Sequence, residues 1–66
     1  MDLQEALNLA ADREYEIRIL PKVPPARSRV LVYDHHGHVL IGVITPDPIG
    51  RIPQAVQKAA DKEDGK

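Results

Sequence analysis

The stretch Val30–Ile44, VLVYDHHGHVLIGVI, places a turn motif between two runs of aliphatic residues. Asp34 and Gly37 have the spacing of a type I turn followed by a residue with positive φ, a position that favours glycine. This arrangement is typical of a three-residue hairpin loop, so residues 29–34 and 38–44 are predicted to be antiparallel strands. The pairs that follow from this turn are Asp34–His38, Tyr33–Val39, Val32–Leu40 and Leu31–Ile41.

This pairing divides the hairpin into two faces that are both apolar. One face is expected to carry Val30, Val32, Leu40, Gly42 and Ile44. The other is expected to carry Leu31, Tyr33, Val39, Ile41 and Val43, with Arg29 at its end. We assign the first face to the core, because Gly42 would let a helix approach closely. The second face is either covered by a helix or loop of the same chain or is a protein interface. We predict the interface, since exposed apolar patches of this size mark interaction sites.

The N-terminal segment 2–11 has the pattern of a short helix. Asp2 and Glu5 have the spacing of a capping box. The apolar residues that recur at helical spacing are Leu3, Ala6, Leu7 and Ala10. Residues 14–20 alternate between apolar and charged side chains, as in a strand with one face in water. Pro21 is expected to end this strand and to open a proline-rich loop, because proline cannot donate to a sheet ladder.

A second helix is predicted at residues 52–62, with Pro53 in its first turn, where the missing N–H costs little. Its buried stripe is expected to be Ile52, Ala55, Val56 and Ala59. Residues 61–66 are expected to be a frayed polar tail. Residues 1–60 therefore form one domain with the element order α-β-β-β-α. Two short helices cannot easily cover both faces of a small sheet. The predicted fold class is α+β, a three-stranded antiparallel sheet with both helices packed on one face.

The chain is short, and its core is expected to be thin. It has 66 residues, with no cysteine, no phenylalanine and no tryptophan. A domain of this length buries only about 60% of the surface that its unfolded chain exposes, and it is marginally stable alone. Disulfides and thiolate metal sites are excluded, so oligomerisation is the remaining support. The outer strand at 38–44 also lacks proline and internal charge, and such edges recruit further strands. We therefore expect a homodimer.

The N-terminal sequence MDLQEAL has neither the basic region nor the apolar run of a secretory signal peptide. No segment approaches the length needed to span a membrane. We expect a cytoplasmic protein with no membrane partner. The sequence contains no glycine-rich phosphate loop and no recognised nucleophile motif, so we expect no cofactor and no enzymatic activity.

The sequence DHHGH offers a candidate metal site. Asp34, His36 and His38 could supply a carboxylate and two imidazoles, which are ligands that zinc prefers. Stable sites normally draw their ligands from more than one element, however, and all three histidines of the chain lie in this motif. The turn geometry requires the aspartate and the glycine by itself. We therefore predict a turn and no bound metal.

Four basic residues surround the predicted proline-rich loop: Arg18, Lys22, Arg27 and Arg29. Residues 17–33 carry these four and no acidic residue, whereas residues 1–16 carry five acidic residues and one arginine. The cluster is either a solvated loop that balances the acidic N-terminus or a contact site for phosphate or an acidic partner. The net charge of the whole chain is −1, so nucleic acid is the less favoured partner.

The predicted element order resembles the double-stranded RNA-binding domain, which runs α-β-β-β-α at a similar length. Pro24-Pro25-Ala26 lies before the second strand, where that family commonly has a Gly-Pro-x-His loop, and Ala26 replaces the histidine. The family's last helix opens with a Lys-Lys-x-x-Lys cluster that contacts phosphates. The corresponding residues here are Arg51-Ile52-Pro53-Gln54, with Lys58 alone further along. The resemblance implies a shared topology, and no RNA-contacting residue is carried over from it. Nucleic-acid binding through the basic residues of segment 18–29 is an alternative function.

A short sheet followed by a helix is also similar to HicB-type antitoxin domains, which gives a second alternative. Our preferred prediction is a small non-enzymatic protein-binding module of the regulatory, adaptor or inhibitor type. It forms a homodimer, binds another protein, or does both. Its predicted interface consists of Leu31, Tyr33, Val39, Ile41 and Val43.

Overall fold

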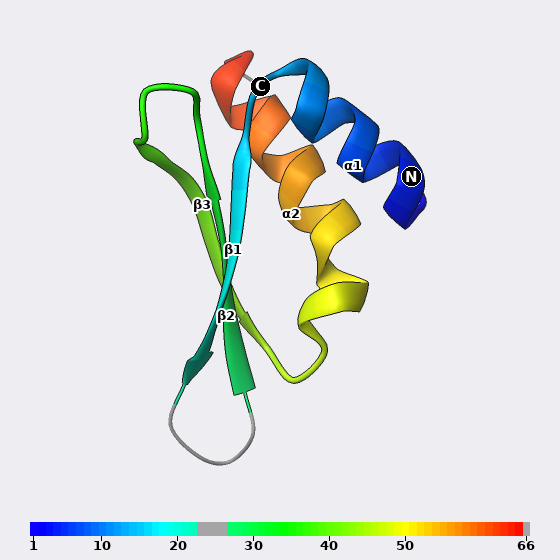
Figure 1. The fold of residues 1–66 in the computed structure, drawn as a ribbon, viewed down its shortest axis with the longest axis vertical. Coiled ribbons are helices and arrows are strands. Elements are labelled where there is room, and N and C mark those ends of the chain that lie inside the picture. Colours follow the sequence, from blue (N-terminus) through cyan, green and yellow to red (C-terminus); the bar gives the residue numbers. More distant parts are fainter. Residues whose placement is uncertain (23–26, 66) are drawn as a thin grey trace.

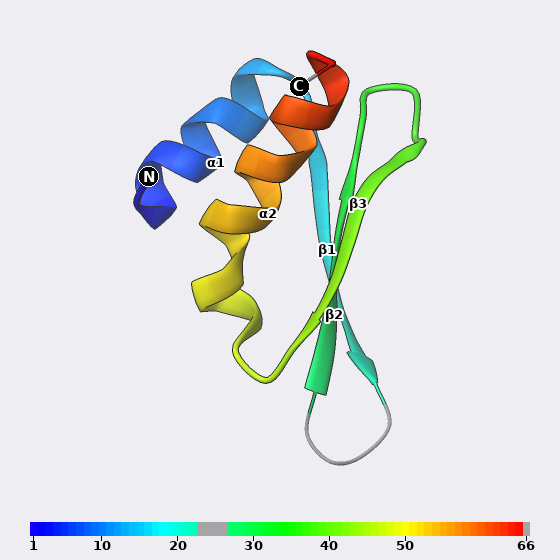
Figure 2. The same ribbon diagram turned by 180° about the vertical axis from the view of Figure 1, so that it is seen from behind.

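The computed structural model describes residues 1–22 and 27–65 of the chain. The elements follow the order α1 (Leu3–Asp12), β1 (Glu16–Lys22), β2 (Arg27–Tyr33), β3 (Val39–Thr45) and α2 (Pro48–Glu63). The strands form one antiparallel sheet in the order β1-β2-β3, and both helices lie on the same side of it (Figures 1 and 2). Helix α2 packs against β2 and β3, and α1 packs against α2. The predicted α+β fold class is confirmed.

Helix α1 begins with the predicted capping box. The Asp2 carboxylate accepts the Glu5 N–H at 2.8 Å, and the Glu5 carboxylate accepts the Asp2 N–H at 3.2 Å, which satisfies two otherwise free donors. Of the predicted apolar face, Ala6 and Ala10 are buried, whereas the two leucines are exposed. This difference follows from the packing partner, because contact with a neighbouring helix covers only the narrow alanine stripe.

Strand β1 extends two residues beyond its predicted end. It includes Pro21, which lies opposite Ser28 of β2, so the prediction that Pro21 ends the strand was wrong. The physical reason is that β1 is an edge strand. A proline in an edge strand costs no ladder bond when its nitrogen faces away from the neighbouring strand. The remainder of the predicted proline-rich loop, residues 23–26, lies outside the described residues.

The motif DHHGH forms the predicted turn. The Gly37 N–H donates to the Asp34 carbonyl at 3.0 Å, and the Asp34 N–H donates to the His38 carbonyl at 2.9 Å. Gly37 has φ 83°, a left-handed conformation that glycine adopts without steric cost. The next pair, Tyr33 with Val39, also agrees with the prediction.

Beyond Val39 the register differs from the prediction by one residue. Val32 pairs with Ile41 and not with Leu40, and Leu31 pairs with Gly42. Leu40 is therefore an extra residue in β3, a β-bulge that the sequence pattern did not predict. Because successive side chains in a strand point to opposite faces, one extra residue exchanges the faces of everything that follows it.

The core confirms this exchange. The fully buried side chains of the sheet are Val30 and Val32, and they pack with small residues of both helices. Ile41 and Val43 pack against this core, so their predicted placement on the outer face was wrong. Gly42 pairs with the outer-face residue Leu31, so its predicted role in admitting a helix was also wrong.

Helix α2 begins four residues before its predicted start. The Asp47 carboxylate accepts the Gly50 N–H at 3.1 Å, and Pro48 occupies the first helical position. Pro53 consequently lies inside the helix. The predicted buried stripe is confirmed at Ile52, Ala55, Val56 and Ala59. The helix continues through residues 61–63, and Asp64 is its C-cap, so the first part of the expected polar tail is helical.

Candidate protein interface

The sheet has one face that points away from both helices, called the open face below. Residues paired across neighbouring strands project to the same face, so the register assigns its members. They are Glu16, Arg18 and Leu20 on β1, Arg27, Arg29, Leu31 and Tyr33 on β2, and Val39, Gly42 and Ile44 on β3.

The apolar part of the open face draws on all three strands. The exposed fractions are 41% for Leu20, 50% for Val39 and 48% for Ile44. Leu31 and Tyr33, on the central strand, are half-buried between these neighbours. The structure thus places Leu31, Tyr33 and Val39 of the predicted interface on one uncovered surface. It places Ile41 and Val43 on the helix side, and it adds two residues that the sequence reasoning missed.

Arg18 is held over the aromatic ring of this surface. Its Nε donates to the Glu16 carboxylate at 2.8 Å, and its guanidinium carbon lies 5.4 Å from the centroid of the Tyr33 ring. The bond to Glu16 raises the pKa of the Arg18 guanidinium above its ordinary value. A cation over an aromatic face is attracted by the ring quadrupole. Arg18 therefore covers part of Tyr33 and adds a charged border to the apolar surface.

Arg27 and Arg29 lie on the same face, on the central strand. Both are exposed, and neither takes part in an ion pair with any residue in the described part of the chain. The side chain of Lys22 lies outside the described part, although its backbone pairs with Arg27. The basic residues predicted around a loop and the apolar residues of the hairpin are therefore neighbours on one face. The sequence analysis placed Arg29 at the end of this face, but it did not place Arg18 and Arg27 beside it, because the pairing of β1 with β2 was not predicted.

The candidate metal ligands are engaged in the turn. The Asp34 carboxylate accepts the backbone N–H groups of His36 and His38, both at 2.9 Å. The bond from the His38 N–H is the largest cause that lowers the pKa of Asp34. The His38 imidazole Nδ1 lies 3.9 Å from the same carboxylate, and this ring is largely exposed. Among residues 1–22 and 27–65, no group of three or more His, Cys, Asp or Glu is arranged to hold a metal ion.

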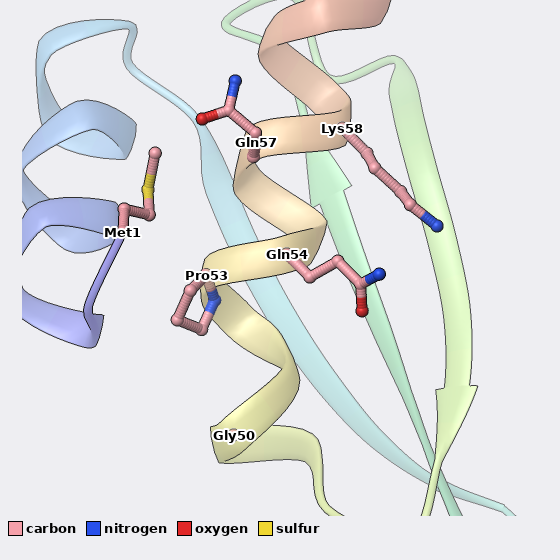
Figure 3. A pocket seen from close by; sticks show the side chains of 6 residues that line it. All are labelled: Met1, Gly50, Pro53, Gln54, Gln57 and Lys58. Carbon is pink, nitrogen blue, oxygen red and sulfur yellow. The ribbon is translucent and has the colours of Figure 1, made fainter.

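An open depression of about 530 Å³ lies beside α2. It is lined by Met1, Gly50, Pro53, Gln54, Gln57 and Lys58. Figure 3 shows that Gln54 and Lys58 extend on one side of the helix, while Met1 lies on the other. In a specific ligand pocket, polar groups converge on a common point. The polar groups of this depression do not.

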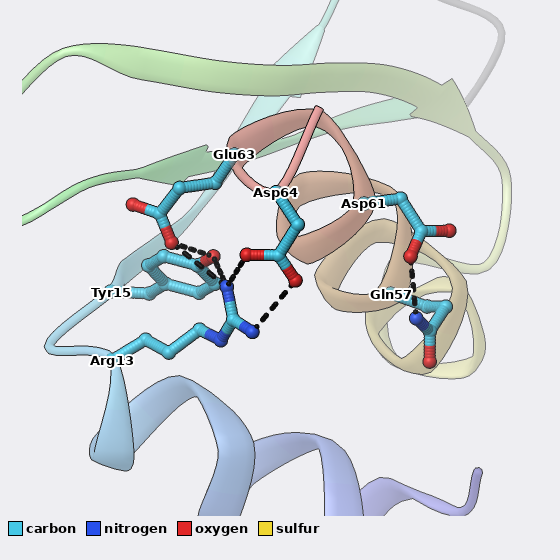
Figure 4. A network of polar contacts seen from close by, with 6 residues as sticks. All are labelled: Arg13, Tyr15, Gln57, Asp61, Glu63 and Asp64. Carbon is cyan, nitrogen blue, oxygen red and sulfur yellow. Dashed lines mark hydrogen bonds and ion pairs between the residues drawn. The ribbon is translucent and has the colours of Figure 1, made fainter. Parts of the chain in front are cut away.

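A polar cluster at the other end of α2 was not predicted. Arg13 donates to Glu63 and Asp64 at 3.0 Å each, and the Tyr15 hydroxyl donates to Glu63 at 2.8 Å (Figure 4). The pKa of Tyr15 is raised mainly by burial and to a smaller extent by the hydrogen bond to Glu63. This cluster, called the Arg13 clasp below, joins the start of β1 to the end of the last helix.

Comparisons with models of protein families, with curated protein sequences and with solved structures find no match for the chain. Among the described residues, no helix combines the length and the apolar character needed to cross a membrane.

Proposed function

We propose that this chain is a small, non-enzymatic protein-binding module of the regulatory or adaptor type, and that it works as a homodimer whose interface draws on residues of its open face. The observation that carries this proposal is the uncovered apolar surface contributed by all three strands. Its members are Leu20, Leu31, Tyr33, Val39 and Ile44. A sheet that met water on this face would alternate apolar and polar residues on every strand, as β1 largely does.

The energetics support self-association of moderate strength. Fully burying an aliphatic side chain contributes about 1.5–3 kcal/mol, so burying the exposed halves of Leu20, Val39 and Ile44 in two copies would contribute at most about 5–9 kcal/mol. Association costs about 4–15 kcal/mol in lost translational and rotational freedom. The free energy gained by burial is comparable to the lower part of the association cost. Burial of the half-buried residues of the central strand adds to the gain. A micromolar dissociation constant corresponds to about 8 kcal/mol, so a dimer of that affinity also requires the contributions of the central strand and of hydrogen bonds between the two copies.

Light scattering of the wild-type chain over a dilution series from roughly 1 to 100 µM tests the proposal. The expected result is a dimer mass at the highest concentrations that falls toward the monomer mass on dilution. A monomer mass throughout the series would contradict the homodimer.

Nucleic-acid binding is the second candidate function. It is favoured by one observation, the presence of Arg18, Arg27 and Arg29 on the same face as the aromatic ring of Tyr33. Arginine contacts phosphates, and aromatic rings stack on bases. Against it, Arg18 is paired with Glu16, and the chain has a net charge of −1.

A titration of labelled single-stranded and double-stranded RNA separates the two functions. We expect no binding tighter than about 10 µM at physiological salt, because non-specific affinities lie in this range. Phosphate contacts weaken steeply as salt concentration rises, whereas apolar association does not. Sub-micromolar binding that is lost in the double variant Arg27→Ala/Arg29→Ala would establish the nucleic-acid function.

A further inference from the structure

The two edges of the sheet differ in their ability to accept another strand. Strand β1 carries Pro21 within it and the Glu16–Arg18 ion pair on its open face. Proline and charged side chains are the devices by which natural sheets block an edge. Strand β3, VLIGVIT, has no proline and no charged residue, and no other described strand pairs with its outer side. A β-bulge also disrupts an edge, so the unprotected edge in the described part of the sheet is the segment of β3 beyond the bulge, residues 41–45.

We propose that two copies of the chain pair antiparallel through their β3 edges and form one continuous six-stranded sheet. The proposal rests on the proposed homodimer and names the part of the molecule that joins its two halves. A two-fold axis places the same strand on both sides of the seam. Because β3 is uncharged, this arrangement brings no charged side chain into the seam, whereas pairing through β1 would bring charged side chains and Pro21, which cannot donate a hydrogen bond, to the seam.

The regular part of β3 also determines the register. Side chains that are paired across two strands must project to the same face of the sheet. A strand can therefore pair antiparallel with its own copy only when the two-fold axis lies between the two copies of one residue. The segment beyond the bulge runs from residue 41 to residue 45, and Val43 is its centre. An axis through Val43 places Gly42 of each copy opposite Ile44 of the other. The exposed Ile44 side chain then lies over a position with no side chain, which leaves room for it.

A matched pair of variants tests the seam. Ile44 and Leu20 both flank Arg29 on the open face, Ile44 from β3 and Leu20 from β1. A glutamate at either position can pair with Arg29, so both variants are expected to fold. Ile44→Glu places charges in the seam and is expected to raise the dimer dissociation constant roughly tenfold or more. Leu20→Glu is expected to change it by less than about twofold, because it lies on the far edge.

Disulfide trapping provides a measurement that does not require a destabilised dimer. The cysteine-free chain allows a single variant, Val43→Cys, in which the new thiol lies opposite its own copy across the seam. Residues opposite one another in an antiparallel pair lie about 4.5–5.5 Å apart, within reach of a disulfide. Mild oxidation should give a covalent dimer on a non-reducing gel. The control is Ile19→Cys, which lies at the centre of β1 on the same face of the sheet as Val43 and should remain monomeric.

The outcomes separate this inference from the proposed function. A wild-type chain that is monomeric at all concentrations overturns both. A wild-type dimer that both glutamate variants dissociate overturns the β3 seam and supports face-to-face packing of the open faces. If Ile44→Glu fails to fold, the cross-linking experiment decides between the arrangements. A covalent dimer of the β1 cysteine variant, or no covalent dimer of the β3 cysteine variant, overturns the seam. Selective dissociation by Ile44→Glu, or a covalent dimer from β3 alone, supports it.

Discussion

At the scale of single residues, Gly50 has an unusual reason to be glycine. Its conformation does not require glycine, but a Cβ at this position would overlap the carboxylate of Asp47. That carboxylate caps α2 by accepting the Gly50 N–H. A side chain at residue 50 would therefore require the capping carboxylate to move.

This contact predicts that the effect of Gly50→Ala on stability depends on whether the Asp47 cap is present. Alanine stabilises a helix interior by about 1 kcal/mol relative to glycine, and loss of an aspartate cap costs about 0.5–2 kcal/mol. In the wild-type chain the two effects oppose each other, so Gly50→Ala should not stabilise. In an Asp47→Ala background the clash is gone, and the same substitution should raise the free energy of unfolding by about 1 kcal/mol. Urea denaturation of the four proteins measures this, and equal effects in both backgrounds would contradict the contact.

Asp34 is expected to make stability depend on pH in acid. Its pKa is lowered from the ordinary value of 3.8 in the folded chain by the backbone N–H groups of His38 and His36. A lowered folded-state pKa means that the carboxylate stabilises the fold above its unfolded pKa and that this contribution is lost as pH falls through the folded pKa. Asp34→Asn cannot lose a charge. Urea unfolding between about pH 5 and pH 2 should therefore show a steeper loss of stability in the wild type than in Asp34→Asn. Parallel curves would contradict this role.

At the scale of elements, the sequence pattern predicted the element order, the turn and most of the core, but it did not predict the bulge. The turn depends on local requirements at Asp34 and Gly37, and these can be read from the chain directly. The extra residue Leu40 is different, because both registers of β3 bury aliphatic residues and only the contacts with β2 distinguish them. Consequently the predicted grouping of Leu31, Tyr33 and Val39 on one face agrees with the register, the face predicted for the residues after the bulge was wrong, and the interface itself stays a prediction.

Two other boundaries were missed for different reasons. The start of α2 could have been found, because Asp47-Pro48 is a typical N-cap followed by a first-turn proline. The extension of β1 through Pro21 could not, because it depends on β1 being an edge strand, which is a property of the assembled sheet. The Arg13 clasp joins residues that are about fifty positions apart, and no local pattern marks it.

The bulge predicts different effects of the same substitution at two isoleucines of β3 that lie on opposite faces of the sheet. Ile41→Glu places a charge against the core and should lower the free energy of unfolding by roughly 2 kcal/mol or more. Ile44→Glu lies on the open face and should change it by less than about 0.5 kcal/mol. Both are measured by denaturation at low protein concentration, where dimerisation contributes little. A larger effect at Ile44 than at Ile41 would show that the faces are assigned the wrong way round.

At the scale of the whole molecule, the Arg13 clasp closes the chain on itself. It connects the α1–β1 junction with the last turn of α2, and these segments lie side by side in both views (Figures 1 and 2). Exposed ion pairs are individually weak. In the clasp, however, Arg13 contacts both carboxylates and Glu63 also contacts Tyr15, so each contact holds the others in place.

Removal of either side of the clasp should have the same consequence. Arg13→Gln should lower the melting temperature by an amount on the order of a few degrees, because it removes contacts to both carboxylates. The double substitution Glu63→Gln/Asp64→Asn should do the same. Combining all three changes should add little to either, since the interaction is already lost. Fully additive decreases in a thermal melt would contradict a shared interaction.

Gly42 also has a consequence for the folding landscape of the chain. Without the bulge, β3 would shift by one residue, and its other aliphatic set, with Gly42 in the middle, would face the helices. This competing register buries a glycine where the native one buries Ile41 and Val43, so it leaves a void and has a higher free energy. Gly42 thus acts against a misfolded alternative. A valine there would fill the void and would also crowd Leu31 in the native register, where a Cβ lies 3.0 Å from that side chain. Gly42→Val should therefore populate both registers, seen as two sets of amide resonances from β3, and a single set would show that the native register is selected by other contacts.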